Sequence, residues 1–454
     1  MKKLTLLLVC ITVVIAACAT PPSDTVTSDT KIATKTPKLK PTTVPESKLD
    51  VDESKLQGLT IAVWYPWFGL EADFFETLVS EFNAENEWGI IVTPVGQTNF
   101  GYLYENVTTS IPTPNRPNLV IALPEHASAW HAEGMVADLD PYQSDPKYGV
   151  QVAEFPLVFW NQDVTGDVRI AFPAQRTARF LLWNETWAGE LGFKSPPAST
   201  ADFQEQVCAA HQSMLTDQAP ENDGQGGWIV DTEPMTAYAW LLAFEGGVLE
   251  SNDYRFLTPN NIAAFKYVKS LAEMSCAWQI NSDGSTLDSF ANRQALVITA
   301  SLEDLPEQSR AFARAGNSDE WHAISFPGGG AMPVYGSSYV MLKASPQAQL
   351  AAWLFITWLI APEQDARWVE TTHLFPMRTS TQELLAEYKD THPQWFEAVE
   401  LLTHGEVQPE LASWRLVKIM LGDGFSHMFR ANVPSGQVAA ILAQMESTSR
   451  DLSK

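Results

Sequence analysis

Residues 58–95, GLTIAVWYPWFGLEADFFETLVSEFNAENEWGIIVTPV, decide the fold class of this chain. The run 59–64 is short, apolar and contains several β-branched residues, so it predicts a buried strand. A second apolar run begins at Ile90. Between the two runs, apolar side chains recur at helical spacing, at Phe74, Phe75, Leu78, Val79 and Phe82. The stretch is therefore a strand–helix–strand unit, which places ligands beyond the carboxyl ends of its strands.

Aromatic rings gather where the first of these strands ends. The sequence YPWFG at 65–69 cannot continue the strand, because proline lacks an amide donor and glycine favours a turn. Rings at this edge can stack on a flat, partly apolar ligand, or they can pack into the core. Tyr65 and Trp67 are therefore candidate ligand contacts, with core packing as the alternative.

Strands and helices alternate along the rest of the chain. This alternation predicts an α/β protein with more than one sheet. The expected strands are 118–123, 168–172, 180–183, 294–299 and 339–342, and the expected helices are 127–134, 238–244, 260–276 and 346–359.

The first eighteen residues predict an export signal. Lys2 and Lys3 give a positive start, and residues 4–17 are apolar but too few to span a bilayer as a mature helix. Small residues then precede Cys18, an order that resembles the bacterial lipobox, in which the cysteine thiol is lipidated, for example with palmitate. The prediction is a lipoprotein outside the cytoplasm, anchored to the membrane through Cys18. An ordinary cleaved signal peptide is the alternative.

Residues 19–57 predict a disordered tether. They are mainly Thr, Pro, Ser, Lys and Asp, and they cannot bury enough apolar surface to fold. A flexible chain of this length reaches about 35 Å from its anchor. The formal net charge of the chain is −25, so nucleic acid and anionic membrane surfaces are poor partners for the folded part.

The chain has four cysteines, two of which belong to the signal segment. Cys208 and Cys276 remain, and an even pair in an oxidising compartment predicts a disulfide. Two buried free thiols are the alternative.

Catalytic and metal-binding motifs are absent from the sequence. It contains no Gly-x-Ser-x-Gly, His-Glu-x-x-His or Walker pattern, and Gly328-Gly329-Gly330 fits a connector. His126 and His131 are five residues apart, which does not bring two imidazoles to one helix face for a metal. We expect no cofactor and no metal. Scattered carboxylates leave a glycosidase as an alternative, while sixteen tryptophans suit the apolar faces of sugars.

The order of segments resembles the extracellular solute-binding proteins of ABC importers, the large family that includes maltose- and glycerol-phosphate-binding proteins. The resemblance covers essentially the whole chain from Gly58 to about Ser447. It rests on seven short phrases that occur in the family's order. They are IAVW at 61–64 with FNAEN at 82–86, NLVI at 118–121, GMVADLD at 134–140, RFLLWN at 179–184, FLTP at 256–259, AAWLFI to APE at 351–363, and FPMR at 375–378.

The resemblance implies the two-lobe periplasmic-binding-protein fold of type II, with hinged α/β lobes and a ligand cleft between them. Lobe one would comprise residues 58–170 plus 337–375, and lobe two residues 171–336 plus 376–454. The predicted disulfide would then lie within lobe two. The implied protein is a monomer that captures a carbohydrate and delivers it to the permease subunits of the importer.

The resemblance also implies a set of ligand contacts. Trp414 coincides with a sugar-stacking tryptophan of the maltose binder, although Lys418 stands where an arginine is expected. Pro124 replaces the aromatic residue typical before the acidic contact, which argues against a maltose-like ligand. The implied contacts are Tyr65, Trp67, Glu125, His126, Gln175, Arg176, Thr236, Gly336, Ser337, Arg378 and Trp414.

The expected function is binding without catalysis, in which a sugar, oligosaccharide, polyol or sugar phosphate closes the lobes. One alternative is a non-sugar solute, because this fold hosts many ligands. A secreted sugar-processing enzyme is a second alternative, and a sensory or scaffold lipoprotein with the same fold is a third.

Overall fold

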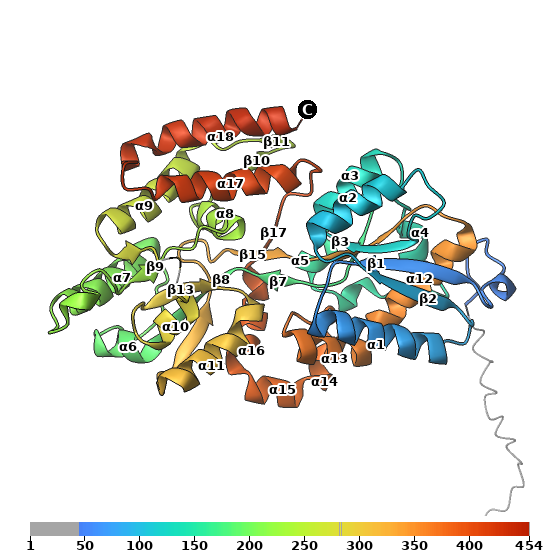
Figure 1. The fold of residues 1–454 in the computed structure, drawn as a ribbon, viewed down its shortest axis with the longest axis horizontal. Coiled ribbons are helices and arrows are strands. Elements are labelled where there is room, and N and C mark those ends of the chain that lie inside the picture. Colours follow the sequence, from blue (N-terminus) through green and yellow to red (C-terminus); the bar gives the residue numbers. More distant parts are fainter. Residues whose placement is uncertain (1–44, 281, 283, 454) are drawn as a thin grey trace, which may run out of the picture. The chain divides into compact units, whose positions relative to one another are not determined.

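The computed structural model describes residues 45–280, 282 and 284–453 (Figure 1). The predicted signal peptide, the lipidation site at Cys18 and residues 19–44 of the predicted tether lie outside the described residues. Among the helices that the structure does describe, none is both long and apolar enough to cross a membrane.

Residues 45–57 differ from the predicted tether. The carboxylate of Asp145 accepts hydrogen bonds from the Ser47 hydroxyl at 3.0 Å and from the Lys48 amide at 2.7 Å. The side chain of Leu56 is fully buried in the core under the first sheet. The folded part of the chain therefore includes these residues, because local apolar side chains and one buried carboxylate hold them in place.

The first five-stranded sheet contains the strand–helix–strand unit from which the sequence analysis began. Strand β1 pairs in parallel with β2 and β3, and β16, from late in the chain, pairs antiparallel with β3 and with β6. Apolar helices cover the sheet and contribute to its core. In spatial order the strands are β2 (Ile91–Gly96), β1 (Thr60–Tyr65), β3 (Leu119–Ala122), β16 (Ser338–Met341) and β6 (Phe172–Pro173), and the helices are α1 (Leu70–Glu85), α2 (Phe100–Ser110), α3 (Pro124–Ala132), α12 (Pro346–Leu359) and α13 (Pro362–Thr372).

The second five-stranded sheet is built from the middle of the chain. Strand β8 lies between two antiparallel partners, β13 and β14. The C-terminal helices α17 and α18 pack with α8 and α9 in the core that also covers this sheet (Figure 1). The strands are β12 (Ala277–Trp278), β9 (Trp228–Ile229), β13 (Val297–Ala300), β8 (Phe180–Asn184) and β14 (Trp321–Ile324), and the main helices are α7 (Thr200–Leu215), α8 (Pro234–Ala243), α9 (Pro259–Glu273), α10 (Thr286–Ala291), α11 (Leu305–Ala315), α16 (Pro393–Glu400), α17 (Trp414–Met428) and α18 (Val438–Leu452).

A small third sheet carries the segments that connect the other two. Strand β7 (Thr177–Ala178) continues from β6 toward β8, and β15 (Met332–Tyr335) leads into β16. Strand β17 (Gly405–Val407) pairs in parallel with β15 and precedes α17. The remaining short elements are α4 (Asp140–Gln143), α5 (Leu157–Trp160), β4 (Val164–Thr165), β5 (Val168–Arg169), α6 (Glu185–Glu190), β10 (Leu249–Glu250), β11 (Asp253–Tyr254), α14 (Thr381–Leu384) and α15 (Ala386–Thr391), with 3-10 turns at Glu53–Lys55, Val152–Glu154, Pro220–Asn222, Leu302–Asp304, Leu401–His404 and Ser435–Gln437.

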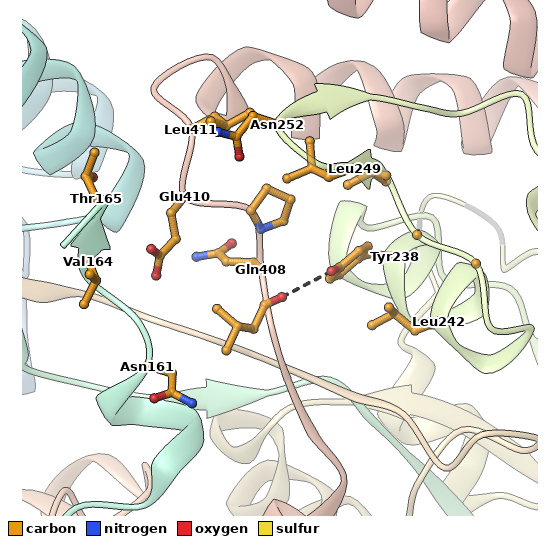
Figure 2. A pocket seen from close by; sticks show the side chains of 16 residues that line it. Asn161, Val164, Thr165, Tyr238, Leu242, Leu249, Asn252, Gln408, Glu410 and Leu411 are labelled. Carbon is orange, nitrogen blue, oxygen red and sulfur yellow. Dashed lines mark hydrogen bonds between the residues drawn. The ribbon is translucent and has the colours of Figure 1, made fainter.

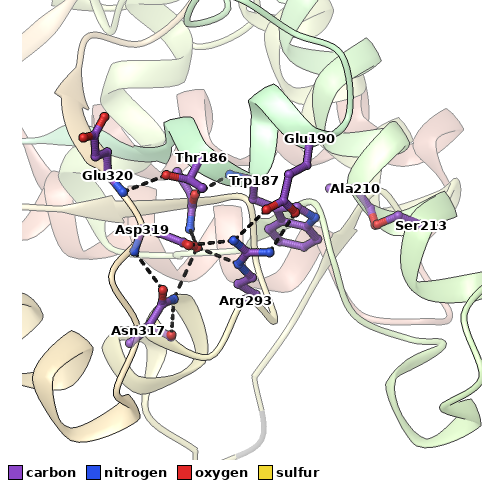
Figure 3. Close-up of polar contacts among 11 residues, drawn as sticks. Thr186, Trp187, Glu190, Ala210, Ser213, Arg293, Asn317, Asp319 and Glu320 are labelled. Carbon is purple, nitrogen blue, oxygen red and sulfur yellow. Dashed lines mark hydrogen bonds and ion pairs between the residues drawn. The ribbon is translucent and has the colours of Figure 1, made fainter.

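Two covalent or ionic links strengthen the second sheet and its helices. A disulfide joins Cys208 of α7 to Cys276, as the sequence analysis predicted. Arg293, whose φ of 56° lies in the left-handed region, forms ion pairs with Asp319 at 2.6 Å and Glu190 at 2.8 Å (Figure 3). This guanidinium ties the turn before β13 to the chain before β14 and to α6.

Candidate ligand-binding site

The segments that connect the two large sheets meet at a buried ion pair. The side chains of Arg176 and Asp163 are both fully buried, and Arg176 Nη2 lies 2.8 Å from Asp163 Oδ2. The other Asp163 oxygen accepts a hydrogen bond from Ser338 Oγ at 2.7 Å. Glu410 Oε1 accepts the Asp163 amide at 2.8 Å. Three parts of the chain that are distant in sequence, 163–176, 338 and 410, are therefore held together at one point.

Gly336, in the connection between β15 and β16, has a position that only glycine fits. Its φ is 152°, which side chains with a Cβ rarely adopt. A Cβ built there would lie 2.2 Å from the carbonyl oxygen of Gln175. Glycine at this position therefore allows the connection between β15 and β16 to pack directly against the backbone at Gln175.

A cavity of about 180 Å³ lies at this junction. Its residues come from the end of β3, the start of β8, the first turn of α8, the connection between β15 and β16, and α17. The cavity therefore draws on both five-stranded sheets. It is lined by Leu123, Arg179, Glu233, Pro234, Met235, Tyr335, Gly336, Gln408 and Lys418.

A carboxylate buried at the start of α3 contacts Lys418, one of the residues that line this cavity. Glu125 has no exposed surface, and its Oε1 accepts a hydrogen bond from Lys418 Nζ. Burial opposes ionisation and is the largest single influence, but the charges of Lys418 and His126 and the hydrogen bonds to the carboxylate together lower the pKa of the Glu125 carboxyl. The other oxygen, Oε2, has no hydrogen-bond partner among the described residues. Glu125 is thus an ionised group with one acceptor oxygen to spare.

A second ion pair lies across the cavity. Arg179 Nη2 is 3.1 Å from Asp231 Oδ2, and Arg179 Nε donates to Thr236 Oγ1 at 3.1 Å. The Thr236 hydroxyl in turn donates to Asp231. This closed set of contacts fixes the direction of the Arg179 guanidinium.

A larger cavity of about 500 Å³ adjoins the first, because Gln408 lines both. Figure 2 shows Gln408 and Glu410 between Val164 on one side and Tyr238 on the other. Burial and the neighbouring Asp163 raise the pKa of Glu410 to about 7. The cavity is lined by Asn161, Val164, Thr165, Gly166, Tyr238, Leu242, Gly246, Gly247, Val248, Leu249, Asn252, Val407, Gln408, Pro409, Glu410 and Leu411.

Several residues predicted to contact ligand lie outside the linings of both cavities. Trp67 is 7 % exposed and packs on Trp368 with ring centroids 5.0 Å apart, while its Nε1 donates to Gln175 Oε1 at 3.1 Å. Gln175 Oε1 also accepts the Ser337 hydroxyl at 3.1 Å. Tyr65 donates its hydroxyl to Glu76. None of these side chains lines either of the two cavities.

Trp414 and His126 are buried as well. Trp414 has no exposed surface, stacks on Tyr254 and donates from Nε1 to Gln408 Oε1 at 3.1 Å. It therefore lies behind a cavity residue. Burial lowers the pKa of His126 to about 4, so this imidazole is neutral beside the Tyr104 ring.

Arg378 takes part in neither cavity. Its Nη1 lies 3.1 Å from Glu154 Oε2, and its guanidinium packs over the Phe155 ring. Of the predicted residues, the structure brings Gly336 to the smaller cavity directly, and Glu125, Thr236 and Trp414 each through one contact with a lining residue.

Sequence reasoning did not select Arg179, Asp231, Glu233, Tyr335 or Gln408. Two signals were available. Glu233 directly precedes a proline that starts a helix, and Arg179 follows the segment that leaves the first sheet. No group of three or more His, Cys, Asp or Glu side chains within the described ranges is placed to hold a metal ion.

The chain is similar to solved structures of sugar-binding proteins. It matches MalE, a sugar-binding protein of Xanthomonas citri, with a TM-score of 0.74 and 18% identity over 87% of this chain and 97% of that one. The cyclic alpha-maltosyl-1,6-maltose binding protein of Arthrobacter globiformis matches with a TM-score of 0.71 and 16% identity, over 87% of this chain and 99% of that one. UgpB of Mycobacterium tuberculosis, in complex with glycerophosphocholine, matches with a TM-score of 0.70 and 16% identity, over 86% of this chain and 98% of that one. These likenesses show the expected two-lobe α/β fold.

A sequence search of curated proteins finds no match. The sequence does match a family model, that of the bacterial extracellular solute-binding protein, over residues 77–397. Since this match spans most of the chain, it identifies the family independently of the fold. The chain belongs to the bacterial extracellular solute-binding proteins.

Proposed function

We propose that this protein is the substrate-binding component of an ABC importer. It captures a carbohydrate and delivers this ligand to the permease subunits. One observation carries the proposal: a cavity lined from both five-stranded sheets lies where their connecting segments meet. A ligand held there contacts both halves of the molecule at once. The family supports the binding role, and members of this family act outside the cytoplasm.

Carbohydrate is the proposed ligand class. The solved relatives bind cyclic maltosyl-maltose, other sugars and glycerophosphocholine, as their descriptions state. The cavities of this chain offer carboxylate, amide and hydroxyl groups beside apolar side chains, which is how proteins bind the hydroxyls and C–H faces of sugars. Among the predicted contacts, we retain Glu125, Thr236 and Gly336 as binding residues, and assign Trp67, Trp414, Gln175, Arg176 and Ser337 to the framework that positions them.

The proposed mechanism is hinge closure without chemistry. Lobe one comprises residues 58–170 plus 337–375, preceded by 45–57 and extended to β6 (Phe172–Pro173), which pairs with β16 in the first sheet. Lobe two comprises residues 174–336 plus 376–454. The ligand gains contacts to both lobes only in the closed state, so binding shifts the population toward that state. No bond in the solute is made or broken.

The N-terminal sequence supports a lipid anchor at Cys18. Small residues precede this cysteine after a short apolar segment, so we propose a monomeric lipoprotein tethered to the outer face of a membrane. Radiolabelled palmitate should enter the wild-type chain and not the Cys18→Ser variant. Equal incorporation into both chains refutes the anchor.

A thermal-shift screen against mono- and oligosaccharides, polyols and non-sugar solutes tests the function. A solute that binds only the folded chain raises the melting temperature by mass action. Glu125→Gln should abolish most of the shift, whereas Glu133→Gln, at an exposed position ending the same helix, should keep it. A panel without any carbohydrate response contradicts the proposal. Release of shorter products from an oligosaccharide would instead support an enzyme.

A further inference from the structure

We propose that the smaller cavity selects a hydroxyl-rich solute that carries a protonated amino group, and that it excludes sugar phosphates. This inference rests on the proposed function and narrows its substrate class. It follows from how the charged groups around the cavity are already paired.

Both cations that line the cavity are committed to carboxylates. Arg179 pairs with Asp231 at 3.1 Å, and Lys418 donates to Glu125. An anionic solute would therefore compete with these carboxylates for the two cations. No other Lys or Arg lines the cavity. The cavity thus offers a phosphate no cation that is free of a carboxylate partner.

The carboxylates around the cavity, in contrast, outnumber its cations, because Glu125, Asp231 and Glu233 face only Arg179 and Lys418. Glu125 Oε2 is fully buried and has no hydrogen-bond partner within the described part of the chain. Glu233 lines the cavity and takes part in none of the ion pairs found among the described residues. Because Glu233 lies at an exposed position of the lining, an entering solute can reach its carboxylate and donate to it.

Further carboxylates surround the cavity residue Tyr335. Burial raises the pKa of its hydroxyl, and the charges of Glu303, Asp304 and Asp231 raise it further, against the opposite effect of Arg179. The carboxylate of Glu303 is held there by the Thr177 hydroxyl at 2.8 Å. These acids add to the negative potential that an entering solute meets, without adding a cation.

The chemistry of the ligand follows from this imbalance. Neutral hydroxyls satisfy carboxylate acceptors, and an ammonium does so with an added charge attraction that is strong where water is partly excluded. A phosphate adds repulsion instead. An amino-substituted carbohydrate is therefore the class that uses the charge of Glu233, the lining carboxylate that takes part in none of the ion pairs among the described residues.

A matched set of sugars tests the inference by titration calorimetry on the full chain. The β-1,4-linked glucosamine dimer differs from cellobiose only in having amino groups in place of hydroxyls. We expect the dimer to bind at least tenfold more tightly, this advantage to shrink with added salt, and glucose 6-phosphate not to bind. Equal or tighter binding of cellobiose, binding of glucose 6-phosphate, or no binding of the dimer overturns the inference.

A variant at Glu233 tests whether the charge of this side chain, and not a change in the folded structure, causes the preference for the amino sugar. Glu233→Gln should reduce the advantage of the amino sugar to less than threefold while leaving the melting temperature of the unliganded protein unchanged. Glu205→Gln, at an exposed position on α7, should keep the full advantage. An amino-sugar advantage that survives Glu233→Gln overturns the assignment. The proposed function itself fails only if the neutral carbohydrates of the wider screen also fail to bind.

Discussion

Glu410 Oε1 accepts a hydrogen bond from the backbone amide of Asp163 at 2.8 Å, although 247 residues separate the two in sequence. The backbone oxygen of Glu410 also accepts the Ser128 hydroxyl at 2.6 Å. The chain between β17 and α17 is thereby attached to two segments associated with the first sheet. The Glu410 carboxyl also lines the larger cavity.

The contact predicts a specific dependence of stability on pH. Burial and Asp163 raise the pKa of Glu410 from an ordinary 4.5 to about 7 in the folded protein. Between these two values the folded state binds a proton that the unfolded state releases, so the free energy of unfolding rises as pH falls from 8 to 5.5. Glu410 should contribute on the order of 1 kcal/mol to this rise.

Urea unfolding at the two pH values measures this contribution. The Glu410→Gln variant should show a smaller rise than wild type, while Glu400→Gln, at an exposed position, should behave as wild type. An identical rise in the Glu410→Gln variant would show that this carboxyl does not titrate in that range.

The buried Arg176–Asp163 pair predicts a large loss of stability when one partner is removed. Arg176→Met leaves the Asp163 carboxylate buried without its cation, which should lower the free energy of unfolding by about 3–5 kcal/mol. The matched control is Arg450→Met, which removes an exposed partner of Glu446 and should cost less than about 1 kcal/mol. Similar losses for both variants in chemical denaturation would contradict the assigned role.

The backbone conformation and close contacts of Gly336 predict that any side chain at this position destabilises the protein. Gly336→Ala places a methyl group against the Gln175 carbonyl at a strained φ, so it should lower the free energy of unfolding by about 2 kcal/mol or more. It should also weaken ligand binding, because Gly336 lines the smaller cavity. Gly436→Ala, where a Cβ meets nothing within 4 Å, serves as the control. A Gly336→Ala protein with wild-type stability would refute the steric argument.

The Cys208–Cys276 disulfide predicts sensitivity to reduction. It closes a loop with a sequence separation of 68, so its loss should destabilise the fold by about 2–4 kcal/mol through the unfolded state. Adding a phosphine reductant should lower the melting temperature of the wild type and leave the Cys208→Ser/Cys276→Ser double variant unchanged. Recovery of both cysteines as free thiols in non-reducing peptide maps would contradict the bond.

Much of the fold was predictable because long apolar patterns are local. The predicted helix 346–359 coincides with α12 (Pro346–Leu359), and the strand predicted at 180–183 lies within β8. Helix α3 begins at Pro124, three residues earlier than predicted, because proline fits the first turn of a helix. Boundaries thus depended on single residues, whereas element types depended on whole segments.

The binding site was less predictable because burial is a tertiary property. The sequence placed Trp67 at the end of a strand, but it could not show that Trp368, from α13, would cover its ring. Likewise, the pairing of Glu125 with Lys418 joins residues 293 apart. Local pattern locates the edge of a sheet, and only the complete fold decides which side chains at that edge remain accessible.

Strand β16 also determines when the first sheet can be completed. It lies between β3 and β6, yet it comprises residues Ser338–Met341, after the whole second sheet has been synthesised. Until those residues emerge, β3 lacks the neighbour that separates it from β6, and a nascent chain cannot acquire its native tertiary structure. The first sheet therefore reaches its native strand order only late in synthesis, after the strands of the second sheet are already available to pair.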